Sequence, residues 1–336
     1  MSKKRVLFLC KKRNDSYGQS AGLGNSSIFV IDAITKFNID AKLVTVIDAN
    51  CIDKEVFNYK PTHVIIEALW VTPAKLEEIV KLHRNVKFII RIHSQIPFLS
   101  NEGIAIEWLY GYQSLSDTYP NIYISTNNFE SHQDLWDGQL GNVLLPNIYF
   151  RQGDFTPVKK DHNILNIGGF GAIRPLKNQL IQAMAAIKFA KSTNKFMKFH
   201  INGNRIEQKG DAIYKNIVSL FANNQYELVQ HDWMPHDKFI EVVKTMDIGL
   251  QVSFSESFNI VTGDFVHNNV PIVVSDDIEW MPWWTKADTT ELDSIVNKLK
   301  LCYFGRHFGL QEFNKLNLDN YNKDSLSKWL RFLKRD

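Results

Sequence analysis

Residues 253–275 read SFSESFNIVTGDFVHNNVPIVVS and carry two acidic residues on which the interpretation of the whole chain depends. The order of apolar and polar positions predicts a strand end, a loop with Glu256, a short helix with Asp264, and a buried strand at residues 271–274. Eight positions separate Glu256 from Asp264, slightly more than two helical turns. The two carboxylates therefore face one side if the helix begins just after Glu256.

The start of this short helix is also a candidate anion site. The exposed amides at its N-terminus would belong to Ser257, Phe258 and Asn259, and such amides favour phosphate. A phosphate site between two carboxylates that bind hydroxyls is suited to a nucleotide sugar. Taken alone, however, an acid at a helix start gains from the helix dipole, and an acid further along is often a solvated surface residue.

The composition is that of a globular protein large enough for two domains. The chain has 336 residues, of which 44% are hydrophobic and 22% charged, and no apolar run approaches the roughly 20 residues that cross a bilayer. The opening MSKKRVLFLC fits a strand better than a signal peptide, because its apolar run is only about five residues and no cleavage site follows. The formal charge of +3 is too small by itself to indicate nucleic-acid binding.

Several familiar sites have no matching motif in the sequence. The odd, widely spaced Cys10, Cys51 and Cys302 suggest neither disulfides nor a cysteine metal site, so a reducing cytoplasm is expected. There is no Asp-x-Asp metal motif, no histidine pair with zinc spacing, no ATP-binding loop of the Gly-x-x-x-x-Gly-Lys type and no Gly-x-Ser-x-Gly nucleophile elbow. We therefore expect no metal site and no cofactor.

Short apolar strands alternate with helical stretches in the first half of the chain. The predicted strands are residues 5–10, 42–47, 62–67, 87–92, 122–125 and 142–145. The predicted helices are residues 26–37, 73–83, 103–115 and 130–136. Apolar strands between helices indicate a parallel sheet covered on both faces, and ligands of such sheets bind beyond the carboxyl ends of the strands.

The alternation restarts after a segment that we interpret as a linker. Its sequence, LPNIYFRQGDFTPVKK, holds two prolines and ends in a charged run. The second half has predicted strands at residues 163–167, 198–201, 226–229 and 248–252 and predicted helices at 176–191, 211–223, 236–245 and 323–333. We thus expect a first Rossmann-like domain at 1–147, a linker at 148–161, a second domain at 162–320 and a closing helix at 321–336.

Residues 163–275 resemble retaining glycosyltransferases of the GT-B fold, specifically family 4. The segments NIGGFGAIRPLKNQ and MDIGLQVSFSESFNIVTGDFVHNNVPIVVS follow the family's order of landmarks. The family has two glutamates separated by seven residues, and this chain has Glu256 and Asp264. The resemblance implies two Rossmann-like domains whose parallel sheets face a cleft, with Glu256 on hydroxyls of the donor sugar and the shorter Asp264 on the ribose.

A second landmark is the glycine-rich turn that contains Gly169 and Gly171, followed by Arg174 and Lys177. Glycines let the backbone approach a phosphate, and the two cations supply positive charge for a departing diphosphate. The family usually has its arginine five residues before the lysine, a position occupied here by Ala172. Lys177 therefore matches well, whereas Arg174 would reach the phosphates by another path.

The first half offers further candidates at predicted strand ends. Gly22 and Gly24, in SAGLGNS, resemble the family's glycine-rich loop beneath the donor phosphates, although a Gly-x-Gly is as often only a tight turn. His93 follows the fourth strand, where the family often has a histidine that hydrogen-bonds the donor sugar, although a single histidine there is more often structural.

Two clusters have open roles. Lys11, Lys12 and Arg13 follow the first strand, where they either bind an anionic acceptor or form a solvated loop. Trp280, Trp283 and Trp284 offer a stacking surface for a sugar or a base, although packing between domains is the more common use of such a cluster.

The sequence therefore predicts a retaining, metal-independent transfer of a sugar from a nucleotide sugar, with UDP as the nucleotide, to a hydroxyl acceptor. The segments CKKRND and HVIIEALWV are similar to bacteriophage-encoded glycosyltransferases, so hydroxymethylated pyrimidine in DNA is the first acceptor considered, with a saccharide or small molecule as the alternative. A non-catalytic nucleotide-sugar-binding protein and an epimerase of the same fold remain open. The expected assembly is a monomer or homodimer.

Overall fold

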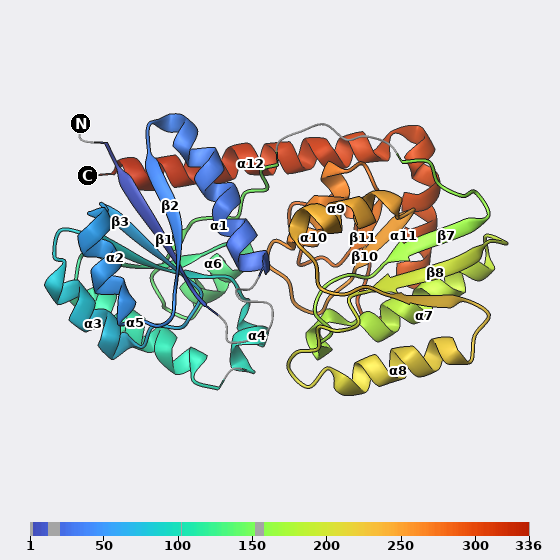
Figure 1. Ribbon diagram of the computed structural model, residues 1–336, viewed down its shortest axis with the longest axis horizontal. Coiled ribbons are helices and arrows are strands. Elements are labelled where there is room, and N and C mark those ends of the chain that lie inside the picture. Colours follow the sequence, from blue (N-terminus) through green and yellow to red (C-terminus); the bar gives the residue numbers. More distant parts are fainter. Residues whose placement is uncertain (1–2, 13–20, 102, 152–157, 336) are drawn as a thin grey trace. The chain divides into compact units, whose positions relative to one another are not determined.

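The computed structural model describes residues 3–12, 21–101, 103–151 and 158–335, which fold as two compact units. The first unit is Met1–Gln152 with Tyr321–Asp336, and the second is Gly153–Asn320 (Figure 1). Each has one parallel sheet with helices around it, which confirms the expected α/β class with two Rossmann-like halves. Residues 152–157 of the predicted linker lie outside the described part of the chain.

The first unit contains a six-stranded parallel sheet in the order β2-β1-β3-β4-β5-β6. Its strands are β1 (Arg5–Lys11), β2 (Asp40–Val46), β3 (His63–Glu67), β4 (Lys87–Ile92), β5 (Ile122–Thr126) and β6 (Val143–Leu144). Its helices are α1 (Ala21–Ile34), α2 (Cys51–Tyr59), α3 (Pro73–Leu82), α4 (Ile96–Ser100), α5 (Ala105–Thr118) and α6 (Phe129–Asp137), with a 3₁₀ turn at Thr35–Phe37. The strand ends at Glu67 and Ile92 leave neighbouring loops at the same carboxyl edge of the sheet.

Successive side chains of β1 point to opposite faces of this sheet, and both faces are covered. Leu7 and Leu9 belong to a core that includes buried residues of α2, α3 and α5. Val6 and Phe8 belong to the opposite core, which includes residues of α1 and Trp329 near the end of the last helix. The near-continuous apolar composition of β1 follows from this burial on both sides.

The second unit contains a five-stranded parallel sheet in the order β11-β10-β7-β8-β9. Its strands are β7 (Ile164–Gly168), β8 (Phe196–Ile201), β9 (Glu227–Gln230), β10 (Ile248–Gln251) and β11 (Ile272–Val274). Its helices are α7 (Gln179–Lys191), α8 (Asp211–Ala222), α9 (His236–Thr245), α10 (Ile260–His267) and α11 (Leu292–Gly305), with 3₁₀ turns at Pro175–Lys177, Trp283–Thr285 and Arg306–Phe308. Helix α12 (Leu310–Lys334) closes the chain.

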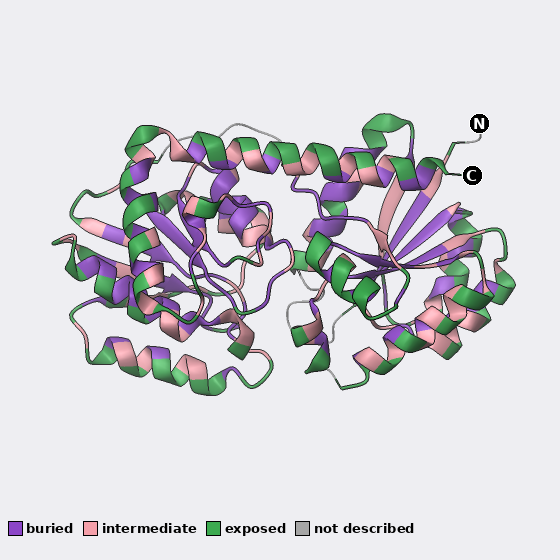
Figure 2. Ribbon diagram, turned by 180° about the vertical axis from the view of Figure 1, so that it is seen from behind, coloured by how far each residue is buried: buried purple, intermediate pink, exposed green. Residues whose placement is uncertain are grey.

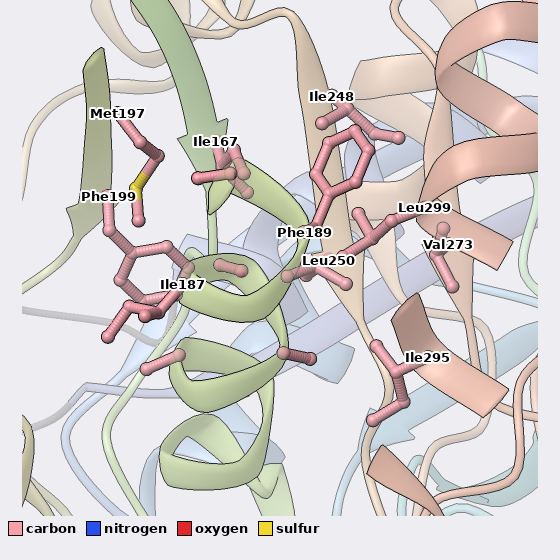
Figure 3. Close-up of a cluster of buried hydrophobic side chains, with 14 of the residues drawn as sticks. Ile167, Ile187, Phe189, Met197, Phe199, Ile248, Leu250, Val273, Ile295 and Leu299 are labelled. Carbon is pink, nitrogen blue, oxygen red and sulfur yellow. The ribbon is translucent and has the colours of Figure 1, made fainter. Parts of the chain in front are cut away.

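The main core of the second unit lies between its sheet and helices α7 and α11 (Figure 3). Ile167 and Leu250 from the sheet are fully buried there with Phe189 of α7 and Leu299 of α11. Burial of a large apolar side chain contributes about 1.5–3 kcal/mol, so this cluster fixes the sheet whose carboxyl edge carries the candidate residues. Figure 2 shows the strands of both units largely buried and their helices partly exposed.

Three features of the predicted element order are corrected. Helix α10 begins at Ile260 rather than just after Glu256. The last helix begins at Leu310, well before the predicted residue 323, and helices α2, α4 and α11 were not predicted. Among the described residues, no helix combines the length and hydrophobicity that crossing a membrane requires.

Candidate active site

The loop after β7 places backbone close to the carboxyl edge of the second sheet. A Cβ atom on Gly169 would lie 2.8 Å from the ring of Phe199, so only glycine fits without a shift. Gly171 has a φ of +118°, a conformation that side-chain-bearing residues rarely adopt, and its amide donates to Asn202 Oδ1 over 2.9 Å. Packing requires the glycine at 169, and backbone conformation requires the one at 171.

Lys177 and Glu256 form an ion pair, Nζ to Oε1, in this unit. Their side chains are 12% and 9% exposed, so the pair is largely removed from solvent. Burial lowers the pKa of Lys177, the charge of Glu256 opposes that effect, and the charge of Arg174 adds to it. The structure thus brings together two residues that the sequence predicts as site residues.

Two buried amide side chains hold the turn of Lys177 against the end of β10. Asn178 has a φ of 54°, and its Nδ2 donates to the carbonyls of Val252 and Thr289 over 3.1 and 2.8 Å. Gln182 donates to the Lys177 carbonyl over 2.6 Å and accepts from the Val252 amide over 3.1 Å. These hydrogen bonds fix the backbone of the turn from which the Lys177 side chain extends.

The loop of Glu256 is fixed from two sides. The Phe254 amide donates to the Leu176 carbonyl over 2.9 Å, which joins this loop directly to the turn that carries Lys177. The Glu256 amide donates to Asp277 Oδ2 over 3.0 Å. These backbone contacts explain why two residues so distant in sequence form one pair.

Arg174 pairs with a different carboxylate from the one that Lys177 contacts. Its Nη1 is 3.7 Å from Glu207, which also binds Arg205 over 2.8 Å. The guanidinium of Arg205 in turn lies 4.0 Å from the centroid of the Trp233 ring. The chain thus has a cluster of cations and an aromatic ring beside the glycine turn, of which the sequence reasoning had found only Arg174.

The predicted anion site at Ser257, Phe258 and Asn259 is corrected by the position of α10. These three residues precede the helix, and Asn259 is its N-cap, with a φ of 59° and a side chain that accepts from the Thr262 amide over 2.9 Å. The carbonyl of Phe258 accepts from Trp280 over 2.9 Å. The first helical turn therefore starts three residues later than expected.

Asp264 lies inside α10, is 1% exposed, and pairs with His236. His236 Nε2 is 2.8 Å from Asp264 Oδ1, and His236 is the first residue of α9. Asp264 and Glu256 thus have different partners. Aspartate is one methylene shorter than the glutamate that the resembling family has at this position. The imidazole of His236, bonded to Asp264, extends the polar group beyond the carboxylate.

In the first unit, His93 follows β4 and is hydrogen-bonded through Nε2 to Glu67 Oε2. Glu67 ends β3, and both Glu67 and the neighbouring Arg91 are 0% exposed. Arg91 Nη1 donates to both carboxylate oxygens of Glu67 over 3.2 and 3.3 Å. Burial raises the pKa of Glu67, but the charge of Arg91 and the hydrogen bonds from His93 and Ser27 oppose it, and the net pKa is lowered.

The remaining first-unit candidates lie at the start of α1 and at the end of β1. Gly22 and Gly24 lie in the first turn of α1 rather than in a loop, and a Cβ atom on Gly22 would meet open space. Lys11 and Lys12 are exposed at the carboxyl end of β1, as expected. Arg13 lies outside the described residues.

Two tryptophans of the predicted aromatic cluster pack within the second unit. Trp280 is 5% exposed and stacks on Phe258 with ring centroids 5.5 Å apart. Trp284 donates to Asn314 over 3.2 Å, whereas Trp283 is 73% exposed with Lys298 over its ring. Of the three tryptophans, Trp283 is therefore the most exposed.

Sequence reasoning missed Glu67 and His236, although signals for both existed. Glu67 is an acid at the carboxyl end of a predicted buried strand, beside the strand that leads to His93. His236 opens the predicted helix that follows the predicted strand at residues 226–229 in the second half of the chain. A charged or titratable residue at the end of a parallel strand, or at the start of the helix that follows it, is a candidate for a site on these grounds alone.

The fold of this chain is similar to that of several solved structures. One is a glycosyltransferase from Rickettsia africae (14% identity, 99% of this chain and 98% of that one, TM-score 0.63). A sucrose-phosphate synthase from Thermosynechococcus elongatus matches with 10% identity over 98% of both chains and a TM-score of 0.68. A UDP-forming α,α-trehalose-phosphate synthase from Burkholderia xenovorans matches with 10% identity over 99% of both chains and a TM-score of 0.66.

No protein-family model and no curated protein matches the sequence. The structural likeness nevertheless extends over nearly the whole of each of these three enzymes. At identities this low it concerns the fold alone: the chain has the two-domain GT-B fold that these glycosyltransferases share.

Proposed function

We propose that this chain is a glycosyltransferase that moves a sugar from a UDP-sugar to a hydroxyl acceptor, with retention of anomeric configuration and without a metal ion. The observation that carries the proposal is the buried pair of Lys177 and Glu256 at the carboxyl edge of the second sheet. Ligands of parallel α/β sheets bind at that edge. The name of the Burkholderia enzyme, a UDP-forming synthase, supports UDP as the nucleotide.

Each partner of the pair has a role on the donor. Glu256 accepts hydrogen bonds from hydroxyls of the donor sugar. Lys177, with Arg174 nearby, stabilises the negative charge that develops on the departing diphosphate, which is the service a metal ion would otherwise provide. The acceptor hydroxyl attacks from the side of the leaving group, whose phosphate oxygen takes its proton, so no carboxylate nucleophile is needed.

The other donor-side residues complete this assignment. Asp264, joined to His236, accepts from the ribose hydroxyls. The backbone at Gly169 and Gly171, at the carboxyl edge of the second sheet, lies along the phosphates. His93 hydrogen-bonds the sugar.

The acceptor has two candidates, each with its own support. The exposed Lys11 and Lys12 favour an anionic acceptor, and hydroxymethylated pyrimidine in DNA is the one proposed from sequence. The names of the sucrose-phosphate and trehalose-phosphate synthases favour a saccharide instead. Both acceptors present a primary or secondary hydroxyl to the same chemistry.

The test offers a panel of nucleotide sugars with hydroxymethylated DNA, with mono- and disaccharides, or with no acceptor. The products are weighed after the DNA has been digested to nucleosides, and released UDP is measured in parallel. A hexose or pentose mass increment on one acceptor, with release of UDP, is the expected result. Tight donor binding without UDP release would identify a non-catalytic binding protein, and conversion of donor without acceptor would identify an epimerase.

A further inference from the structure

The carboxyl edge of the first sheet contains an ion pair that stability alone does not explain. Glu67 and Arg91 are both completely buried on adjacent parallel strands, β3 and β4. A buried ion pair is commonly no more stabilising than apolar residues of the same volume, because both charges lose their hydration. The pair therefore calls for a role other than packing.

Glu67 is held from several elements, which leaves its carboxylate little freedom. Oε1 accepts from Arg91 Nη1 of β4 over 3.2 Å and from Ser27 Oγ of α1 over 3.1 Å. Oε2 faces His93 Nε2. Arg91 is itself fixed, since it also donates to the Leu145 carbonyl over 3.0 Å and to Asn147 Oδ1 over 2.5 Å.

The contact of Glu67 with His93 determines where the imidazole proton lies. A carboxylate oxygen accepts and cannot donate, so a hydrogen bond to Nε2 requires the proton on Nε2. Burial lowers the pKa of His93, and although Glu67 opposes this, Arg91 adds to it, so the ring is neutral at pH 7. A neutral ring with its proton on Nε2 carries a lone pair on Nδ1.

The surrounding charges favour the same state. Arg91 Nη1 lies 3.4 Å from His93 Nε2; a guanidinium only donates, so it competes there with the shorter contact to Glu67, and its positive charge opposes a second proton on the ring. Cys10 of β1 lies in the field of Glu67, and burial raises the pKa of its thiol to about 12, so the thiol carries no charge. An electrostatic interaction with Tyr321 of α12 raises the pKa of Arg91, against the larger lowering by burial. Among the described residues, Arg91 and Glu67 are thus charged groups that lie against the ring and act on its protonation.

We propose that Glu67 is a positioning residue that fixes His93 as the neutral Nε2–H tautomer, so that Nδ1 of His93 accepts a hydrogen bond from a hydroxyl of the ligand. The identity of that ligand as the donor sugar rests on the proposed function. The chemistry selects a group that donates, such as a hydroxyl, and disfavours a carboxylate or phosphate, which would place one lone pair against another.

The test of the positioning step needs no substrate. Nitrogen-15 NMR of histidine-labelled protein at pH 7 is expected to show His93 with a protonated Nε2 and an unprotonated Nδ1. In Glu67→Gln the amide can donate as well as accept, so the ring should populate both tautomers. Because that variant leaves Arg91 without its buried counter-charge, the double variant Glu67→Gln with Arg91→Met keeps the test available if the single one does not fold.

The matched control is His83, whose Nε2 also bonds a carboxylate, Asp53, over 2.7 Å outside this network. Its signals should not change in either variant. A wild-type His93 that is protonated on Nδ1 or on both nitrogens would overturn the proposal, as would an unchanged tautomer in the variants.

The ligand step is tested by adding UDP-glucose or UDP alone to the same sample. The Nδ1 signal of His93 should move with UDP-glucose and not with UDP, and donor turnover in Glu67→Gln should fall about tenfold. If UDP-glucose binds but the Nδ1 signal does not move, the ligand assignment is overturned and the positioning stands. If neither nucleotide binds and no donor is turned over, the proposed function fails, while the tautomer result still decides the role of Glu67.

Discussion

Lys177 and Glu256 are 79 positions apart in sequence and form one largely buried ion pair. Truncation of one partner leaves the other charged and poorly hydrated, a loss of about 3 kcal/mol in buried pairs. The pair is also proposed to act on the donor, so turnover and stability should both respond to its removal.

We expect Glu256→Gln to lower the rate of sugar transfer by about 100-fold or more. An amide accepts hydrogen bonds from hydroxyls less well than a carboxylate, and it leaves Lys177 without its counter-charge. Released UDP is the assay, and thermal unfolding is measured alongside. The control is Lys188→Ala, which removes an exposed pair with Asp293 in the same unit and should leave both quantities nearly unchanged. Wild-type rates in Glu256→Gln would refute the role of this residue.

Asp264→Asn should weaken binding of UDP about tenfold, equivalent to about 1.4 kcal/mol, because the ribose loses an ionised acceptor and His236 loses its partner. Calorimetric titration with UDP gives the dissociation constant. His236→Ala is expected to weaken binding in the same direction. His162→Ala, which removes an exposed histidine, serves as the control. Unchanged affinity in both Asp264→Asn and His236→Ala would exclude the pair from the nucleotide site.

Gly169→Ala should destabilise the second unit by about 1–3 kcal/mol, since its methyl group would lie 2.8 Å from the Phe199 ring. Gly22→Ala is the matched comparison, because a Cβ atom there meets open space at the start of α1. It should raise stability by about 0.5–1 kcal/mol. Denaturant unfolding distinguishes the two, and weaker UDP-sugar binding by a stable Gly22→Ala protein would support its donor-side assignment.

The first unit should lose stability between pH 6.5 and pH 4. Burial lowers the pKa of His63 from its usual 6.5 to about 4, so the unfolded chain binds a proton in this range that the folded chain does not. The stabilisation from a neutral His63 is complete above pH 6.5 and falls as pH drops, by about 3 kcal/mol at pH 4. Urea unfolding of the wild type and of His63→Gln at pH 7 and pH 4.5 measures the difference. An equal pH dependence in both proteins would contradict this assignment.

The sheets were predictable from sequence because buried parallel strands are short, apolar and separated by helices. Residues 5–10 and 87–92, for example, were expected as strands and appear as Arg5–Lys11 and Lys87–Ile92. The first half of α12 was not predictable in this way. Its segment LQEFNKLNLDNY is rich in asparagine, which has low helix propensity, so packing rather than local preference forms the helix there.

The start of α10 shows a signal that was present but not used. Asn259 precedes the helix and its side chain accepts from the Thr262 amide, the usual pattern of an N-cap. Giving weight to that cap would have moved the helix start from residue 257 to 260. The partners of the candidate residues were harder to find: the contact of Glu67 with His93 depends on β3 and β4 being neighbours, which periodicity does not reveal.

Helix α12 also sets the order in which the protein can fold during synthesis. Its last part belongs to the first unit, and Trp329 and Leu333, both completely buried, complete the core beside β1. The second unit ends at Asn320, so its residues have all left the ribosome before those two emerge. The unit that begins the chain is therefore the last to acquire its full core, which reverses the usual order in which domains mature from the N-terminus.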